Sequence, residues 1–259
     1  MIKQFILDAF TDKLFSGNQA AVCVLDGWIP DELMMKIAKE NNFSETAFVV
    51  KCGNDYHLHW FTPGGEISLC GHATLATSYV LFNFYEKSAQ KIVYNTLSGK
   101  LCINRQNDYI ILDFPVFRCD NEVVVTEQMG MALGVMPQKA YLDRDLLLIY
   151  DDESIIRKMK PNFELLKQFE GHGVGVTAPG KDYDCVSRFF VPKFKVNEDP
   201  VTGTIHCMIA PYWAAKLGKS TINAYQASER GGKLCCSVYD GRVKIAGCAV
   251  LYSVSTLQL

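Results

Sequence analysis

A cysteine, a glycine and a histidine follow one another at residues 70–72, where a short predicted strand gives way to an almost wholly apolar helix. The thiol of Cys70 and the imidazole of His72 can both carry protons, and Gly71 allows the backbone to turn. The N-terminus of a helix presents unpaired N–H groups and the positive end of the helix dipole, so it attracts anions. These three residues therefore favour acid–base chemistry on an anionic substrate.

Two carboxylates lie in other turns of the sequence. Glu45 stands in a short polar stretch at the entrance to a predicted strand, with Phe43 and Phe48 nearby. A carboxyl group in such a setting can act as a general base toward a carbon-bound proton, or it can simply be a solvated residue at a strand end. Asp199 precedes a second apolar helix. It could orient a substrate, share a proton with His72, or cap that helix.

The elements that must position these residues follow a repeated plan. Each half of the chain contains several predicted strands and one helix that is apolar nearly all round, which must be buried. These two helices cover about 73–84 and 204–217, and Pro211 inside the second predicts a kink or a missing hydrogen bond. Asp240-Gly241 predicts a hairpin turn. The sequence thus predicts an α+β chain of two similar halves, 1–116 and 117–249, with the last strand, about 250–259, able to complete the first half.

The remaining predicted elements follow from apolar periodicity. Predicted strands cover 2–10, 20–25, 43–50, 56–62, 91–96, 100–106, 109–114, 123–125, 146–150, 173–178, 183–191, 223–226, 233–239 and 243–254, and shorter helices cover 30–41, 127–133, 152–159 and 163–169.

Composition excludes several classes of protein. The net charge of −2 over 259 residues gives no basic excess for nucleic acid, and no apolar run is long enough to span a membrane. Residues 1–10 resemble a first strand more than a signal peptide, so a cytoplasmic protein is expected. The ten cysteines form no C-x-x-C pair, and His57 and His59 have no further ligands at metal-binding spacing, so no metal site is predicted.

Longer motifs resemble the phenazine-biosynthesis PhzF-like family, and they occur in the expected order over most of the chain. The matching residues are Gly17-Asn18 with Ala20-Ala21-Val22, Ser44-Glu45-Thr46-Ala47-Phe48, the stretch 66–76 around Cys70-Gly71-His72, Arg188-Phe189-Phe190-Val191-Pro192, and the stretch 198–206. The resemblance implies a diaminopimelate-epimerase-like fold, in which each half is a curved, mostly antiparallel sheet around a central helix and the active site lies in the cleft between halves. It also implies a cofactor-independent isomerase that acts on a small carboxylate-bearing metabolite, often as a homodimer.

The resemblance also implies roles for particular residues. Glu45 would be the general acid and base, with His72 and Asp199 as further catalytic residues. The substrate-binding residues would be Asn18, Gly71, Gly203 and Thr204. His206 would either support this site or belong to the core. The chain departs from the family pattern at Gln19, where proline is usual, and at Thr204, where serine is usual, and both changes bear on the substrate.

Two alternatives remain open. The first is an amino-acid racemase or epimerase of the same fold that uses Cys70. That mechanism needs a second cysteine, yet the corresponding position of the second half looks like Asp199, and the next thiol is Cys207. Cys70 is therefore better explained as a small buried residue. The second alternative is a ligand-binding protein without catalytic activity. Substrate specificity is expected in loops at about 116–122, 140–145 and 226–233.

Overall fold

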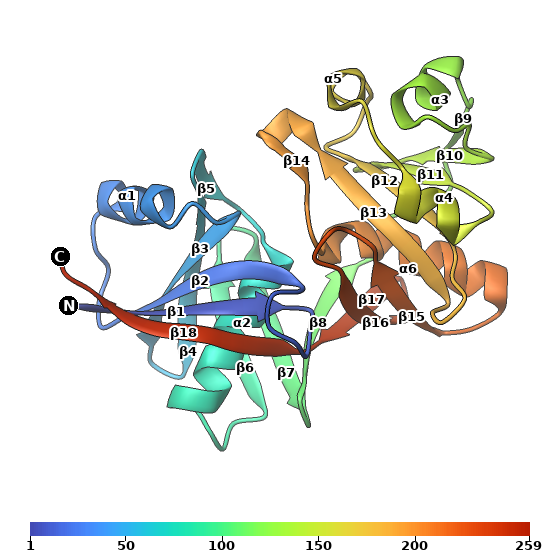
Figure 1. Cartoon of the computed structure of the whole chain (residues 1–259). Coiled ribbons are helices and arrows are strands. Elements are labelled where there is room, and N and C mark those ends of the chain that lie inside the picture. The colour runs from blue at the N-terminus through green and yellow to red at the C-terminus, as the bar shows by residue number, and fades with distance from the viewer. The chain divides into compact units, whose positions relative to one another are not determined.

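The computed structural model describes residues 1–259, and the chain divides into two compact units. The first unit contains Met1–Asp113 and Ala246–Leu259, and the second contains Phe114–Ile245. Figure 1 shows that the C-terminal strand returns to lie beside the N-terminal strand of the first unit. No helix combines the length and the apolar character that crossing a membrane requires.

The first unit is a mostly antiparallel sheet around one buried helix. Its strands are β1 (Ile2–Ala9), β2 (Asn18–Leu25), β3 (Glu45–Cys52), β4 (Asp55–Thr62), β5 (Gly65–Ile67), β6 (Lys91–Thr96), β7 (Gly99–Gln106), β8 (Tyr109–Pro115), which ends at the unit boundary, and β18 (Ala249–Leu257). They pair in the order β18-β1-β2-β3-β4-β6-β7-β8, and only β2–β3 and β4–β6 are parallel. Helix α1 (Asp31–Asn41) packs its apolar face on β3 and β4.

Helix α2 (Gly71–Val80) is the central element of the first unit. Nine of its ten residues are buried, and it lies against β1, β2, β3 and β18. Its buried hydroxyl groups are satisfied locally, because Thr74, Thr77 and Ser78 each donate a hydrogen bond to the carbonyl four residues earlier. The chain continues directly into a π-helix, Leu81–Tyr85.

The second unit repeats this topology strand for strand. Its strands are β9 (Glu122–Val123), β10 (Lys139–Leu142), β11 (Leu146–Ile149), β12 (Val174–Pro179), β13 (Cys185–Val191), β14 (Val196–Glu198), β15 (Thr221–Gln226), β16 (Gly232–Tyr239) and β17 (Arg242–Gly247), which ends at the boundary. They pair in the order β9-β10-β11-β12-β13-β15-β16, and again only two pairs, β11–β12 and β13–β15, are parallel. The short strand β14 pairs with β13, as β5 pairs with β4.

The helices of the second unit are also arranged as in the first. Helix α6 (Gly203–Leu217) follows β14 as α2 follows β5, and it is buried along most of its length against β15 and β16. Short helices α4 (Glu153–Lys158) and α5 (Phe163–Leu166) stand between β11 and β12, where α1 stands between β2 and β3. Together with α3 (Glu127–Leu133), they close a core of their own. The prediction of two similar, mostly antiparallel halves around a central apolar helix is confirmed.

Pro211 leaves one helical hydrogen bond unmade, as predicted. Proline has no N–H, so the carbonyl of Cys207, four residues earlier, loses its usual partner. The backbone N–H of Phe117 donates to that carbonyl instead, at 3.0 Å. The segment that follows β8 is therefore fastened to the middle of α6.

Three predictions about local structure are wrong. The expected loop at 140–145 is wrong for its first half, because residues 140–142 belong to strand β10, whose Ala140 and Tyr141 are buried between β9 and β11. The expected single strand 243–254 is two strands, β17 and β18, separated at Cys248. Helix α2 begins at Gly71, two residues earlier than predicted. The hairpin turn between β16 and β17 is supported, because Asp240 and Gly241 both have positive φ.

Candidate functional site

The main candidate site is built around His72 in the first unit. Because α2 begins at Gly71, His72 is its second residue, and the imidazole is held at the mouth of the helix. Glu45 is the first residue of β3, which is aligned in parallel with β2 so that Glu45 lies opposite Ala20. Sheet and helix together place the Glu45 Oε2 atom 3.0 Å from the His72 Nε2 atom.

This contact is close, but neither atom is satisfied. Only 6% of the His72 side chain and 14% of the Glu45 side chain are exposed. The Nε2 and Oε2 atoms are both buried and neither has an aligned hydrogen-bond partner, so the pair is held by charge and proximity. Buried polar groups are normally hydrogen-bonded, and an exception in a native structure calls for an explanation such as catalysis. The geometry thus leaves one acid–base pair ready to exchange a proton.

Asn18 and Cys70 lie on the other side of the ring. The Asn18 Nδ2 atom is 3.1 Å from His72 Nδ1, and the Cys70 Sγ atom is 3.6 Å from it. If the Asn18 NH₂ group donates to Nδ1, the one proton of a neutral His72 ring is on Nε2 and faces Glu45. If the amide is flipped, its oxygen accepts from the Nδ1–H of a protonated ring. Gly17 makes this placement possible, because its φ of +69° and a neighbouring carbonyl 2.2 Å from the position of a Cβ exclude larger residues.

Charge governs the protonation of this cluster. Burial alone would lower the pKa of His72, but its interactions with the Cys70 and Glu45 side chains raise it well above its usual value. Burial, and then the charge of Glu45, raises the pKa of the Cys70 thiol. Cys70 is consequently a neutral thiol near pH 7, and the Glu45 carboxylate is the anion that keeps a proton on His72.

The same three side chains deserve a test as a metal site. One ligand atom from each of Glu45, Cys70 and His72 can be chosen so that all lie within 4.8 Å of one another. However, Cys70 faces the Nδ1 atom of the ring while Glu45 faces Nε2. The two nitrogens point in divergent directions, so an ion bound to either one would be directed away from the other ligand. The arrangement suits proton transfer better than tetrahedral coordination.

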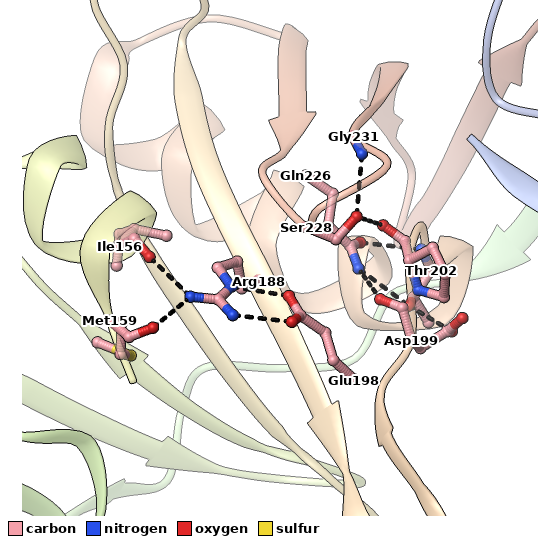
Figure 2. A network of polar contacts seen from close by, with 10 residues as sticks. Ile156, Met159, Arg188, Glu198, Asp199, Thr202, Gln226, Ser228 and Gly231 are labelled. Atoms are coloured by element: carbon pink, nitrogen blue, oxygen red, sulfur yellow. Dashed lines mark hydrogen bonds and ion pairs between the residues drawn. The ribbon is translucent and has the colours of Figure 1, made fainter. Parts of the chain in front are cut away.

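A second group of predicted residues lies in the turn between β14 and α6 of the second unit, which Figure 2 shows. The Thr202 hydroxyl donates a hydrogen bond of 2.5 Å to the Asp199 Oδ2 atom. Asp199 therefore does not cap α6, and no side chain caps that helix. Gly203 and Thr204 are its first two residues, so their N–H groups lie at the helix start.

His206 belongs to the core of the second unit. It is completely buried, its Nδ1–H donates to the Thr202 carbonyl at 2.7 Å, and its Nε2 atom lies 3.3 Å from the Ser187 hydroxyl. Burial lowers its pKa to about 4, so the ring is neutral near pH 7. Of the two roles open from the sequence, support of the site or membership of the core, the structure favours the core.

The predicted site residues thus fall into two groups, one in each unit. Glu45, His72, Asn18 and Gly71 meet in the first unit, and Asp199, Gly203 and Thr204 lie on one turn of the second. The sequence suggested Asp199 as the counterpart of Cys70. This is wrong, because Cys70 is the residue that precedes α2 and Thr202 is the residue that precedes α6. The thiol of one unit is matched by a hydroxyl in the other.

Sequence reasoning missed several residues that hold the Asp199 turn. Gln226, the last residue of β15, bonds to both Asp199 and Thr202, and Arg188 forms a bidentate ion pair with Glu198. Arg188 was noticed only within a motif, and Gln226 only as the first residue of the loop expected at 226–233. For Gln226, the available signal was a buried glutamine at the end of a strand.

Comparison with known proteins agrees with the fold. The family model described as "Phenazine biosynthesis-like protein" matches residues 7–254. A protein of Pseudomonas aeruginosa named as an uncharacterized isomerase is 45% identical over 254 residues, covering 98% of this chain and 97% of that one. The crystal structure of a PhzF-family phenazine biosynthesis protein from Enterococcus faecalis has a TM-score of 0.98 and 45% identity, and the match covers 100% of this chain and 99% of that one.

A more distant structure shows how far the fold extends. A probable proline racemase from Agrobacterium radiobacter has a TM-score of 0.68 at 11% identity, covering 100% of this chain and 93% of that one. That likeness concerns the fold alone, and the predicted diaminopimelate-epimerase-like fold is confirmed. The match over nearly the whole chain and the close relatives establish that this chain belongs to the phenazine biosynthesis-like PhzF family.

Proposed function

We propose that this chain is a cofactor-independent isomerase that moves a carbon-bound proton on a small carboxylate-bearing metabolite, with Glu45 as the general acid and base. The observation that carries the proposal is the buried Glu45–His72 pair, whose facing oxygen and nitrogen lie 3.0 Å apart with no aligned hydrogen bond. Named relatives support the reaction class, since a protein 45% identical over nearly its whole length is called an isomerase.

In the proposed reaction the Glu45 carboxylate removes a proton from carbon and returns it at another position. A catalytic base must offer a lone pair to the substrate, and the Oε2 atom of Glu45 has no aligned hydrogen bond, so only its contact with His72 must give way. His72 is the proton reservoir beside it, because burial lowers the pKa of its ring but its interactions with Cys70 and Glu45 raise that pKa well above the usual value. Asn18 can hold the ring in either protonation state.

The substrate carboxylate would be bound by backbone N–H groups. Neither α2 nor α6 has a side-chain cap, so each helix start, taken within its own unit, offers N–H groups that can bind an anion, and each helix dipole favours negative charge there. Gly71 begins one helix, and Gly203 and Thr204 begin the other. Asp199 would orient a substrate amine or hydroxyl.

The experiment is a metabolite screen in deuterated water with chelator-treated protein, read by mass spectrometry. An isomerase that works by proton transfer should introduce solvent deuterium into one compound and convert it to an isomer. Glu45→Gln should lower that rate by about 10²–10⁴-fold, because the amide cannot accept the proton. Circular dichroism would check that the variant is folded.

A matched control exists in the same unit. Glu66 and His59 form a second glutamate–histidine pair, with Oε1 and Nδ1 2.5 Å apart, but both side chains are more than a quarter exposed. Glu66→Gln removes the same chemical group from a solvated pair and should leave the rate within about twofold of the wild type. If Glu45→Gln and Glu66→Gln behave alike, Glu45 is not the general base. If the wild type neither labels nor isomerises any compound, the chain is a binding protein.

The thiol-dependent racemase remains the alternative reaction, but the structure offers it little support. Cys70 has no thiol counterpart at the start of α6, where Thr202 stands, and Cys207 lies deeper in the helix and is 1% exposed. Burial raises the pKa of Cys207 to about 12, which makes its thiol a poor base.

A further inference from the structure

The orientation of the Gln226 side chain is fixed by groups that have only one possible role. Gln226 is completely buried, and its Oε1 atom lies 2.9 Å from the backbone nitrogen of Thr202. That backbone N–H can only donate, so the oxygen of the amide must face it. The Nε2 atom is thereby turned toward the Asp199 carbonyl, at 2.7 Å, which can only accept. Both contacts demand the same amide orientation.

This orientation sets the direction of the next hydrogen bond. The Gln226 Nε2 atom also lies 3.3 Å from the Thr202 hydroxyl and donates to it. The hydroxyl proton must then point elsewhere, and the Asp199 Oδ2 atom is 2.5 Å away. Gln226, Thr202 and Asp199 thus form a one-way chain, in which each group donates to the next and the carboxylate is the final acceptor (Figure 2).

The turn that carries Asp199 is also held from both ends. Arg188 donates from Nε and Nη2 to the Glu198 carboxylate at 2.7 and 2.8 Å, and from Nη1 to the carbonyls of Ile156 and Met159. On the other side, the Ser228 hydroxyl donates to the Pro200 carbonyl at 2.8 Å and accepts from the Gly231 N–H at 3.0 Å. The turn therefore has little freedom to move away from Gln226.

We propose that Gln226 is a positioning residue, which acts through the Thr202 hydroxyl to hold Asp199 as a hydrogen-bond-accepting carboxylate in one fixed orientation. A hydrogen bond donated to a carboxylate stabilises its charged form. Asp199 then presents negative charge to its ligand, which suits recognition of a cationic or donor group such as a substrate amine or hydroxyl. The inference rests on the proposed function for the use made of Asp199, but the hydrogen-bond chain can be tested without a substrate.

The test is a pH titration of the Asp199 carboxyl by NMR on full-length protein labelled with ¹³C-aspartate, with Asp199→Asn identifying the signal. Thr202→Val keeps the shape and the backbone N–H but removes the hydroxyl, so the midpoint should rise by about one pH unit or more. Thr202→Ser keeps the donor and should titrate within a few tenths of a unit of the wild type.

A matched control is Thr177→Val. Thr177 is another fully buried threonine of the second unit, whose hydroxyl donates to the Val186 carbonyl at 2.9 Å and accepts from the Trp213 indole. Thr177→Val removes a buried hydroxyl of the same kind, but outside the Asp199 turn. The midpoint of the Asp199 titration should therefore not move. If Thr177→Val shifts the midpoint as much as Thr202→Val, or if Thr202→Val shifts it by less than about 0.3 units, the proposal is wrong.

Gln226→Met provides a second variant that removes the whole amide. It should raise the Asp199 midpoint in the same direction as Thr202→Val, and it should accelerate hydrogen exchange of the Thr202 amide at least tenfold. A folded Gln226→Met protein with wild-type titration and exchange would contradict the positioning role. If instead the titrations follow the expectation while no metabolite is labelled in deuterated water, the hydrogen-bond chain stands and the isomerase proposal fails.

Discussion

Helices α2 and α6 occupy equivalent places in two units of the same topology, yet their first turns are equipped differently. Each follows a short strand, begins with glycine, and is buried without a side-chain cap. At α2 the histidine is the second residue, and its ring stays at the mouth of the helix with Nε2 unsatisfied. At α6 the histidine is the fourth residue, and its ring reaches back to bond the Thr202 carbonyl. Two positions along a helix separate the proposed proton carrier, His72, from a ring that supports the structure, His206.

The two histidines also differ in charge. Both are buried, and burial by itself lowers the pKa of each ring. His72 interacts with Cys70 and with the Glu45 carboxylate, and these interactions overcome that effect, whereas His206 meets only a carbonyl and a hydroxyl. A buried imidazole therefore becomes a proton carrier only where an anion accompanies it. The carboxylate of the α6 turn, Asp199, bonds instead to Thr202.

The largest expected effect concerns the rate of proton transfer. His72→Asn keeps a polar side chain beside Asn18 but removes the proton-carrying nitrogen that faces Glu45, so deuterium incorporation should fall by about 10²-fold or more. His206→Asn can still donate to the Thr202 carbonyl and should change the rate by less than about threefold. The measurement is the initial rate of labelling of the metabolite found by the screen.

Either of two outcomes would break this comparison. Equal losses of rate in His72→Asn and His206→Asn would mean that both rings act only by supporting structure. A rate in His72→Asn close to that of the wild type would remove His72 from the proton path and leave Glu45 to work alone.

A smaller effect concerns the pH dependence of stability, and its sign should be opposite for the two rings. His206 has a folded pKa of about 4, below the ordinary value of 6.5. Its unfolded form binds more protons between these values, so the stability it contributes is present above pH 6.5 and is lost as the pH falls toward 4, by about 1.4 kcal/mol per pH unit. His72 has a raised pKa. Its contribution is present below pH 6.5 and is lost as the pH rises through the folded pKa.

Both signs can be measured by urea unfolding of the wild type, His206→Asn and His72→Asn at several pH values, which gives the free energy of unfolding of each protein. The stability advantage of the wild type over His206→Asn should shrink by about 1 kcal/mol between pH 7 and pH 5.5. Its advantage over His72→Asn should instead be larger at pH 5.5 than at pH 9. Parallel curves for the two variants would show that the charge difference between the rings is absent.

The sequence predicted the parts of this comparison that local pattern determines. Both apolar helices and the repeated strands follow from periodicity, because an apolar helix in a globular chain must be wrapped by a sheet. Strand β10 was missed because only two of its four residues, Ala140 and Tyr141, are buried, and such a segment becomes a strand only when β9 and β11 pair with it. Strand β14 was also missed, because it has only three residues and none of them is buried.

The site was less predictable than the fold. The resemblance to a family suggested Glu45 and His72, but nothing in their spacing of 27 residues shows that Oε2 and Nε2 meet. The bond from Thr202 to Asp199 joins residues three apart and could have been inferred from sequence. The contact from Gln226 spans 24 residues to Thr202 and depends on where β15 ends, so only the structure reveals it.

The smallest expected effect comes from giving α2 and α6 the same preceding residue. Cys70→Thr gives α2 the threonine that precedes α6, and threonine is close to cysteine in volume. Cys70 is 5% exposed and its thiol has a raised pKa through burial and the Glu45 charge, so it contributes no base near pH 7. The rate of deuterium incorporation should therefore stay within about threefold of the wild type. Cys119→Thr, in the other unit, is the matched control and should keep the wild-type rate. A hundredfold or greater loss of the labelling rate in folded Cys70→Thr protein alone would restore the thiol mechanism and make the difference between Cys70 and Thr202 the central one.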